Sequence, residues 1–448
     1  MFAASAISLA MTAPLKHFTH AVETDDLQTE KSTTMEMTRR EFALSIAAAS
    51  SLPSSLFEPT SPLGVPRGIV PGRVTWVRDP AAVTWDGTGS WWNDANNSQS
   101  VIDHMVSRSI RGLTNQESDA QAWSAIFHLY NRTHGRGNTG YKAGEKIAIK
   151  PNLNNTTGHG TIDRLNSSPH LILSFVRQLT GPAKVPQSSI TIFDSSRFIP
   201  GNLYDKIHHE FPGVVFVDHI GGDGRVKAEF KPNAIPFSIT SRNASGLDTV
   251  VVEATYLIDA ALLKGHVSSG VTLCAKNLFG ATSIDPDWHK NAHDGFRHNL
   301  DGSASYAAFV DFLGHKDLGE KTILFLVDGL YGNDNADGPP QLKWKMAPFN
   351  DAWPNSIFMS LDGVAIDSVG FDFLASEWPH LVDIANADNY LREAALANDP
   401  PSKTFYDPER DGIRCRSLGV FEHWNNATEK KYSRNLGKAN GIELFQVS

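Results

Sequence analysis

Short β-branched and apolar runs alternate with stretches of helical periodicity along the middle of the chain. The apolar runs, which predict buried strands, are residues 146–150, 189–194, 214–218, 257–264, 322–328 and 356–361. Apolar residues recur three and four positions apart, which predicts helices, over residues 98–113, 117–134, 169–180, 202–211 and 363–377. This alternation predicts an α/β fold with a mostly parallel sheet flanked by helices.

The segments outside this alternation predict smaller structures. Residues 67–97 are rich in Gly, Pro, Trp and Asp, which is typical of an irregular cover, and residues 226–252 predict a small β insertion. We therefore expect a leader over residues 1–57 and an N-terminal helical and irregular cover over residues 58–143. An α/β core domain is expected over residues 144–380, followed by a C-terminal extension packed on the core over residues 381–448.

Five predicted strands end on a charged residue, namely Lys150, Asp194, Asp218, Lys264 and Asp328. Ligands of open parallel sheets bind outside the carboxyl ends of the strands, so charges there converge on one crevice if the strands are neighbours. A single charged strand end is ordinary, because strands end where solvent begins. The whole set favours a site in which the two lysines bind anionic groups and Asp194 and Asp328 orient the lysines or bind a metal.

The glycine-punctuated segment that follows Lys264 carries the densest set of candidate groups. His266, Lys276 and Asn277 all lie in it, and its glycines allow the backbone to approach a ligand closely. A desolvated lysine can act as a base or nucleophile, and a neutral histidine as a proton shuttle or metal ligand. We expect Lys264, His266 and Lys276 to be catalytic and Asn277 to bind substrate. The alternative is that these residues cap helices and form ion pairs.

Three other places offer candidate ligands. The polar loop that begins at Asn152 suits an anionic or polyhydroxy ligand. His289 and His293 are spaced to share one face of a helix, which is a workable arrangement for two metal ligands. Seventeen histidines in the chain also make a chance pair easy. His423 follows Glu422 and is expected to be a substrate-binding base with its orienting acid, or else a capped strand end.

Residues 38–44 read Thr-Arg-Arg-Glu-Phe-Ala-Leu, and an uncharged stretch rich in Ala, Ser and Leu runs to residue 57. Twin arginines before a short apolar region predict a twin-arginine translocation (Tat) signal. The alternative is a basic helix start within a folded domain. The signal predicts the Tat translocon as a partner during export and a periplasmic or extracellular location, where a small molecule would be the ligand.

Composition argues against several other classes. The net charge of −9 argues against nucleic acid or an anionic membrane as a partner. The sequence contains no run of about 18 apolar residues, so it predicts no transmembrane segment. The two cysteines, Cys274 and Cys415, form no Cys-x-x-Cys pair, so we expect no iron–sulfur cluster held by this chain alone. No phosphate-binding Walker loop and no Gly-x-Ser-x-Gly motif occurs.

Several of these segments together resemble the domain of unknown function 362 family. They are residues 149–153 (Ile-Lys-Pro-Asn-Leu), 264–266 (Lys-Gly-His), 275–280 (Ala-Lys-Asn-Leu-Phe-Gly), 327–329 (Val-Asp-Gly) and 360–367 (Ser-Leu-Asp-Gly-Val-Ala-Ile-Asp). The resemblance covers roughly residues 144–378 and implies the fold and the site. The family is uncharacterised, so it implies no reaction. Some relatives carry a ferredoxin-type iron–sulfur module that this chain lacks, so redox chemistry is not carried over.

A more remote similarity links the segment to nickel-pincer lactate racemases. In those enzymes a catalytic histidine lies ten residues before the lysine that holds the cofactor, and His266 and Lys276 have that spacing, with Gly270 between them. A later nickel-ligating histidine would correspond to His293 or His289. The chain departs from the pattern at residues 273–275, which read Leu-Cys-Ala where the racemases have a glycine-rich run. The similarity implies a transition-metal cofactor.

The sequence therefore favours an exported enzyme of unknown reaction that acts on a small polar or anionic substrate at the carboxyl edge of a parallel sheet. In this hypothesis Lys150 and Lys264 bind anionic groups, His266 transfers protons, and Lys276 is a base or cofactor anchor. The rival hypotheses are a non-catalytic periplasmic protein that binds a metal or solute, and a structural surface protein whose polar residues only cap strands.

Overall fold

The computed structural model describes residues 61–156, 158–160, 164–267, 269–283, 296, 299, 301–335, 338–380 and 383–447. The predicted leader with its twin arginines, and the pair His289 and His293, lie outside these residues. No helix within the described ranges is long and apolar enough to cross a membrane.

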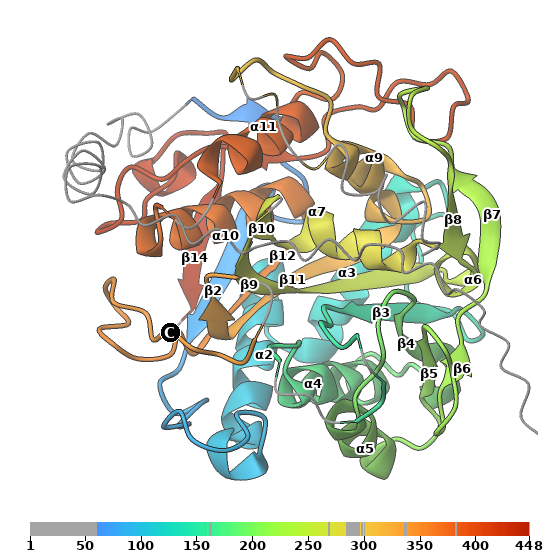
Figure 1. Ribbon diagram of the computed structural model, residues 1–448, viewed down its shortest axis with the longest axis vertical. Helices are drawn as coiled ribbons and strands as arrows, with labels where there is room; N and C mark the ends of the chain where they lie inside the picture. The colour runs from blue at the N-terminus through green and yellow to red at the C-terminus, as the bar shows by residue number, and fades with distance from the viewer. Residues whose placement is uncertain are drawn as a thin grey trace, which may run out of the picture. The chain divides into compact units, whose positions relative to one another are not determined.

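A ten-stranded sheet runs through the described part of the chain (Figure 1). The strand order is β14-β2-β12-β11-β9-β3-β4-β5-β6, and β10 pairs with β9 off this path. The strands are β2 (Arg73–Arg78), β3 (Ile147–Pro151), β4 (Ile190–Asp194), β5 (Val215–Asp218), β6 (Val226–Lys227), β9 (Tyr256–His266), β10 (Gly270–Thr272), β11 (Thr322–Asn333), β12 (Ser356–Ser360) and β14 (Glu443–Val447). Every pairing from β11 to β6 along this order is parallel, and β12 runs antiparallel to both β11 and β2.

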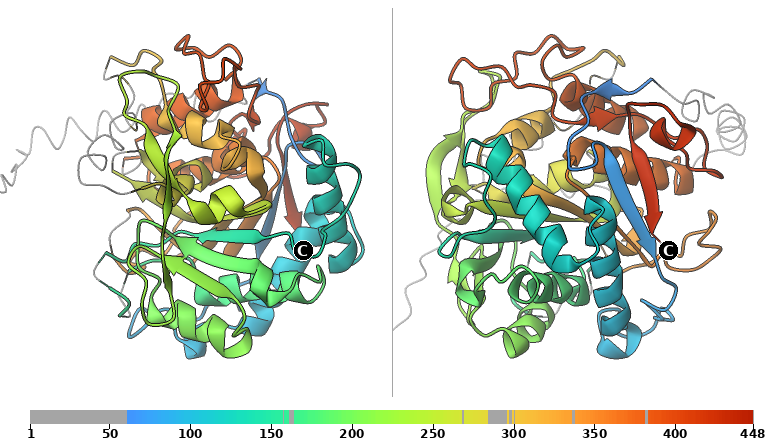
Figure 2. Two further views of the ribbon diagram at one scale, coloured as in Figure 1. Left: turned by 90° about the vertical axis from the view of Figure 1, so that its right-hand side faces the viewer. Right: turned by 180° about the vertical axis from the view of Figure 1, so that it is seen from behind.

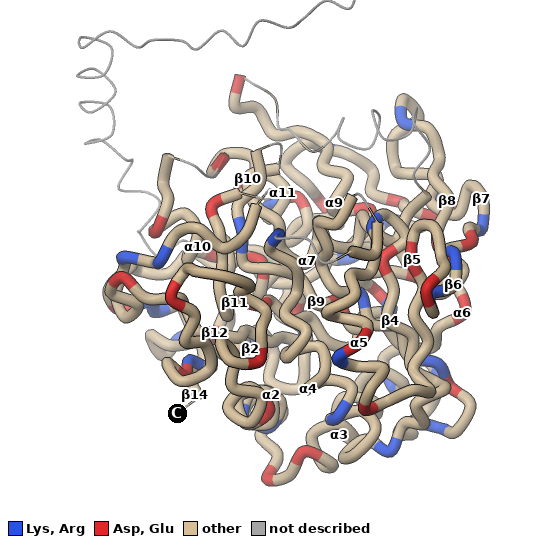
Figure 3. Tube along the Cα trace, turned by 60° about the horizontal axis from the view of Figure 1, so that its bottom comes forward, with Lys and Arg blue, Asp and Glu red and all other residues tan. Residues whose placement is uncertain are grey.

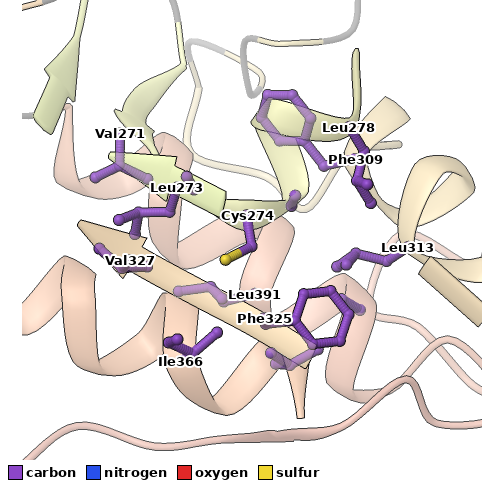
Figure 4. Close-up of a cluster of buried hydrophobic side chains, with 14 of the residues drawn as sticks. Val271, Leu273, Cys274, Leu278, Phe309, Leu313, Phe325, Val327, Ile366 and Leu391 are labelled. Carbon is purple, nitrogen blue, oxygen red and sulfur yellow. The ribbon is translucent and has the colours of Figure 1, made fainter. Parts of the chain in front are cut away.

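Helices cover both faces of the sheet (Figure 2). One face packs against α2 (Gln99–Thr114), α3 (Asp119–Thr133), α4 (Pro169–Thr180) and α5 (Gly201–Glu210). The other packs against α7 (Cys274–Asn277), α9 (Ala308–Gly314), α10 (Gly363–Glu377) and α11 (Ile384–Ala395), and Figure 4 shows part of that apolar layer. Successive residues of β9 alternate between the layers, as strand geometry requires, with Ile258 in one and Leu257 in the other. The predicted α/β fold is confirmed.

Four strands of the sheet, β2, β6, β10 and β14, come from segments that the sequence pattern did not assign to it. The segment 67–97, expected to be irregular, contains β2, and the C-terminal segment contains β14, which pairs with β2 in parallel. β2 reads Arg-Val-Thr-Trp-Val-Arg between glycine- and proline-rich turns, so composition hid a short alternating strand. The expected β insertion consists of β7 (Phe230–Ile235) and β8 (Ser245–Asp248), which pair antiparallel, followed by the short helix α6 (Thr249–Glu253).

The chain changes direction across the sheet between β3 and β9. From β3 it passes through α4 to β4 on one side, whereas β9 lies on the other side of β3 and leads through α7 and α9 to β11. The two connections cover opposite faces of the sheet. The parallel carboxyl ends of β3 and β9 therefore form a topological switch point, which is where open α/β sheets bind ligands.

Asp362 joins the two ends of the described chain to α10. One carboxylate oxygen accepts hydrogen bonds from the backbone N–H groups of Val364 (3.1 Å) and Ala365 (2.9 Å), which cap α10. The other accepts from the backbone of Arg67 (2.8 Å), just after β1 (Leu63–Gly64), and of Val420 (3.2 Å), which begins β13 (Val420–Phe421). β1 and β13 pair with each other, so one buried side chain fixes both segments.

Replacing Asp362 with alanine removes the acceptor for four backbone N–H groups in this buried junction. Each buried donor left unpaired costs about 1–3 kcal/mol, so we expect Asp362→Ala to lower the free energy of unfolding by at least about 3 kcal/mol. Urea denaturation followed by circular dichroism measures this loss. The control is Asp399→Ala, whose side chain is 75% exposed and should change stability by less than about 0.5 kcal/mol. Similar losses in the two variants would contradict the assignment.

Candidate functional site

A cavity of about 190 Å³ opens at the switch point, beyond the carboxyl ends of β3, β4 and β9. Its lining is dominated by polar and cationic side chains, with Lys150, Asn152, Asn154, Asp194, Ser196, Arg197, Lys264, His266, Lys276, Asn277 and Asn335 among them. Three other cavities, of about 730, 500 and 210 Å³, are larger. We take the cavity of about 190 Å³ as the candidate site because it combines the switch-point position with buried ionisable groups.

Lys150 and Asp194 form a buried ion pair at the floor of this cavity. The Lys150 Nζ lies 2.8 Å from Asp194 Oδ2, and the two side chains are 1% and 2% exposed. The ammonium also donates to the Pro151 carbonyl at 2.8 Å and to Asn277 Oδ1 at 3.4 Å. These three acceptors engage all three of its N–H groups. Lys150 therefore has no donor to spare for a ligand and acts on one only through its charge.

A glycine makes room for this lysine. Gly280 lies in η4 (Leu278–Ala281), directly after α7, and a Cβ built there would come within 2.7 Å of Lys150 Nζ and 2.8 Å of its Cε. Any larger residue would have to push the ammonium away from Asp194. The Ala-Lys-Asn-Leu-Phe-Gly motif thus supplies an amide, Asn277, and a glycine that both contact the buried lysine.

The orientation of two amide side chains follows from the Lys150 carbonyl, which can only accept a hydrogen bond. Asn277 Nδ2 donates to the Lys150 carbonyl at 3.0 Å and to Asp259 Oδ1 at 2.6 Å. Its Oδ1 must then face Asn152, whose Nδ2 donates to it at 2.9 Å. This leaves Asn152 Oδ1 buried without a hydrogen-bond partner in the described structure, on a residue that lines the cavity. The cavity wall therefore offers one acceptor to a ligand alongside its cationic groups.

Asp259 lies beneath these amides, inside the apolar run of β9. It is fully buried, one oxygen accepts from Asn277, and the other has no hydrogen-bond partner among the described residues. Burial, reinforced by the nearby charge of Asp367, raises the pKa of Asp259 well above its usual value. The hydrogen bond from Asn277 and the charge of Lys150 oppose this shift in pKa.

A tight strand reversal gathers the three residues expected to be catalytic. β10 folds back on β9 with Thr272 opposite Lys264 and Gly270 opposite His266, and the chain then enters α7. Lys264, His266 and Lys276 consequently line the same cavity. Lys264 Nζ donates to Asn154 Oδ1 at 3.4 Å, and Lys276 Nζ lies 5.7 Å from the centre of the Phe279 ring.

The charge of the cavity lining is predominantly positive. Lys150, Lys264, Lys276 and Arg197 line it, whereas Asp194 is the one carboxylate among the residues that line it in the described chain. Positions of lysine and arginine along the chain are blue in Figure 3. Asp194 pairs with Lys150, and a lining in which cationic side chains outnumber carboxylates favours an anionic ligand.

Asp218 and Asp328 lie at the same sheet edge but outside the cavity lining. Asp328 accepts from the backbone N–H groups of Ser168 (2.7 Å) and Leu330 (3.0 Å), and so fixes the residue that precedes α4. Asp218 accepts from His159 Nε2 at 2.8 Å and from backbone N–H groups of the loop after β5. These two strand-end carboxylates hold loops in place.

His423 is not one of the residues that line this cavity. Its Nδ1 lies 2.6 Å from Asp372 Oδ1 on α10 and its Nε2 lies 3.2 Å from Asp388 Oδ1 on α11. Burial opposes the charged ring, but the charge and hydrogen bond of Asp372 prevail and raise the pKa of His423 to about 10. The imidazolium ties the C-terminal segment to two helices. Glu422, its neighbour, instead accepts from the backbone of Ile442 and Ser433.

Several residues around the site were not predicted from the sequence. Ser196 and Arg197 lie just beyond the end of β4, so only the loop conformation brings them to the cavity, whereas Asn154 belongs to the polar loop that was expected to suit a ligand. Asp259 did carry a signal, because a carboxylate in the middle of an apolar strand pattern is rare unless it has a buried partner.

The fit of a nickel-pincer cofactor is partial. His266 and Lys276 do line one cavity, as the racemase spacing implies. The later histidines, His289 and His293, lie outside the described residues, and within the described ones no group of three His, Cys, Asp or Glu side chains is arranged to hold a metal. Residues 273–275 are fully buried and leave no glycine-rich approach to Lys276. We therefore derive no chemical step through such a cofactor.

The raised pKa of Asp259 predicts how its substitution changes stability with pH. Its stabilising contribution is complete below the unfolded value near 3.8 and is lost as the pH rises through the higher folded value. Asp259→Asn should therefore become more stable than the natural chain, by about 1.4 kcal/mol for each pH unit above roughly 5, until the folded pKa is reached. Urea denaturation between pH 5 and 8 measures this. Parallel curves for the two proteins would show that Asp259 is ionised.

The contrasting variant is Asp194→Asn, which leaves the ammonium of Lys150 buried without its counter-ion. Breaking a buried pair in this way costs about 3–5 kcal/mol, and the cost should appear at every pH in the same series.

Comparison with known proteins agrees with the resemblance seen in the motifs. The family model described as Domain of unknown function (DUF362) matches residues 147–372, just over half of the chain, and this range contains every residue that lines the cavity. No curated protein and no solved structure matches the chain. The similarity to lactate racemases stays a prediction. The chain belongs to the DUF362 family, a family of unknown function.

Proposed function

We propose that the chain is an enzyme that binds a small anionic substrate in the cavity at the carboxyl edge of β3, β4 and β9. The observation that carries the proposal is the charge of the lining, in which three lysines and Arg197 face one carboxylate. The cavity volume of about 190 Å³ restricts the substrate to a small molecule, since pockets for drug-sized ligands start at about 300 Å³.

The residues divide into supporting and contacting groups. Lys150, Asp194 and Asn277 form the hydrogen-bonded floor, and their donors are already engaged. Lys264, Lys276 and Arg197 supply positive charge to the substrate, and Asn152 Oδ1 accepts a hydrogen bond from a hydroxyl or amine on it. His266 is the group on this lining whose ordinary pKa suits proton transfer near neutral pH, which favours acid–base catalysis over simple capture.

Export is a separate part of the proposal, supported by the twin arginines at Arg39 and Arg40 and the uncharged stretch that follows. Replacing both with lysine keeps the charge but removes the guanidinium pair that the translocon recognises. Cell fractionation should then find the full-length chain retained in the cytoplasm. Unchanged export of the double variant would contradict the Tat assignment.

The binding proposal predicts a specific effect of removing one cationic group. Lys276→Gln should raise the Kd for small carboxylates or phosphate at least about tenfold, because it removes one charge from a partly desolvated anion site. Isothermal titration of the full chain with lactate, malate and inorganic phosphate measures the Kd. Lys276→Arg keeps the charge and should lose less affinity.

The matched control is Lys403→Gln, whose side chain is 75% exposed and pairs with Asp399. It removes the same charge from the molecule but should leave each Kd unchanged. Equal losses in Lys276→Gln and Lys403→Gln, or no saturable binding of any of the three anions, would contradict an anion site at this cavity.

A further inference from the structure

A second pocket, of about 500 Å³, lies at the opposite end of the central strands, where β11 begins and β12 ends. Its walls are mostly apolar side chains from three directions, Ile126 and Leu129 of α3, Ile323 and Phe325 of β11, and Leu361 after β12. Ile126, Ile323 and Phe325 are at most 5% exposed, so they form a floor. An apolar pocket of this size is in the range that binds small ligands.

The rim of this pocket carries an uncompensated positive charge. Arg67 is neutralised by Glu320, whose carboxylate lies 2.8 Å from its guanidinium, and it also donates to the Ser417 carbonyl at 2.7 Å. Arg416 lines the same rim and makes no hydrogen bond or ion pair within the described part of the chain. Tyr130 adds a hydroxyl group, and burial raises its pKa to about 12.

We propose that this pocket binds a single-chain fatty carboxylate. The hydrocarbon chain lies on the floor formed by α3 and β11, and the carboxylate pairs with Arg416 at the rim. An uncharged apolar ligand would form no ion pair with the Arg416 guanidinium, and a cationic amphiphile would be repelled by it. The pocket shares no residue with the cavity at the carboxyl edge, so this site is independent of the proposed enzymatic function.

The test is isothermal titration calorimetry of the full chain with dodecanoate, kept below its critical micelle concentration. We expect saturable binding, and each methylene added between octanoate and dodecanoate should tighten it about threefold to fourfold, as burial of the chain requires. Dodecanol, which has the same chain without the charge, should bind at least about fivefold more weakly. Affinity that does not depend on chain length would overturn the proposal.

Two variants test whether the fatty carboxylate binds in this pocket and pairs with Arg416. Leu129→Trp fills the pocket from α3 and should abolish binding, and an unchanged circular dichroism spectrum and Tm will show that the variant is folded. Arg416→Gln should weaken dodecanoate at least about fivefold but leave dodecanol unchanged. Arg414→Gln, an exposed arginine two residues earlier, is the matched control and should have no effect.

Binding that survives Leu129→Trp, or that falls equally in Arg414→Gln and Arg416→Gln, would put the fatty acid elsewhere. If dodecanoate does not bind and Leu129→Trp instead changes the sedimentation coefficient of the protein, the pocket is an interface between copies of the chain and the proposal is wrong.

Discussion

The buried ion pair between Lys150 and Asp194 joins the ends of two neighbouring parallel strands, and the geometry of the candidate site follows from it. Two charges removed from water cost several kcal/mol each unless their remaining hydrogen-bonding groups are also satisfied. Here Ser196 donates to the carboxylate through its N–H (3.0 Å) and hydroxyl (2.9 Å), while Pro151 and Asn277 accept from the ammonium. The pair therefore requires β3, β4 and α7 to stay in one arrangement.

That arrangement also explains how a buried acid and a cationic cavity coexist a few residues apart. The Asn277 amide contacts Lys150 on one side and Asp259 on the other, so it separates the ion pair from a carboxyl whose pKa is raised by burial. The cationic side chains of β9 and α7 then border a cavity whose floor already has its hydrogen bonds made. Ligand binding in such a site costs little reorganisation, which is the condition that favours both tight binding and catalysis.

The sequence predicted α4 and α10 with the bounds that they have, because their periodicities are strong, but it did not predict the short helices α7 and α9. It also predicted that strand-end charges lie at one sheet edge. It could not tell that Lys264 borders the cavity while Asp328 holds the start of α4, since loop geometry decides this. β2 was missed because the glycine- and proline-rich turns around it hid a short alternating strand. The role of His423 stayed open because its two carboxylate partners lie 51 and 35 residues away.

A crystal structure of the full chain soaked with selenate, a dianion that an anomalous map identifies directly, tests the central claim. The account predicts the strongest anomalous peak inside the cavity at the carboxyl ends of β3, β4 and β9, within hydrogen-bonding distance of Lys276 or Arg197, and its loss in Lys276→Gln. Selenate found only on exposed lysines and arginines, with the cavity holding none at the same concentration, would contradict an anion site there.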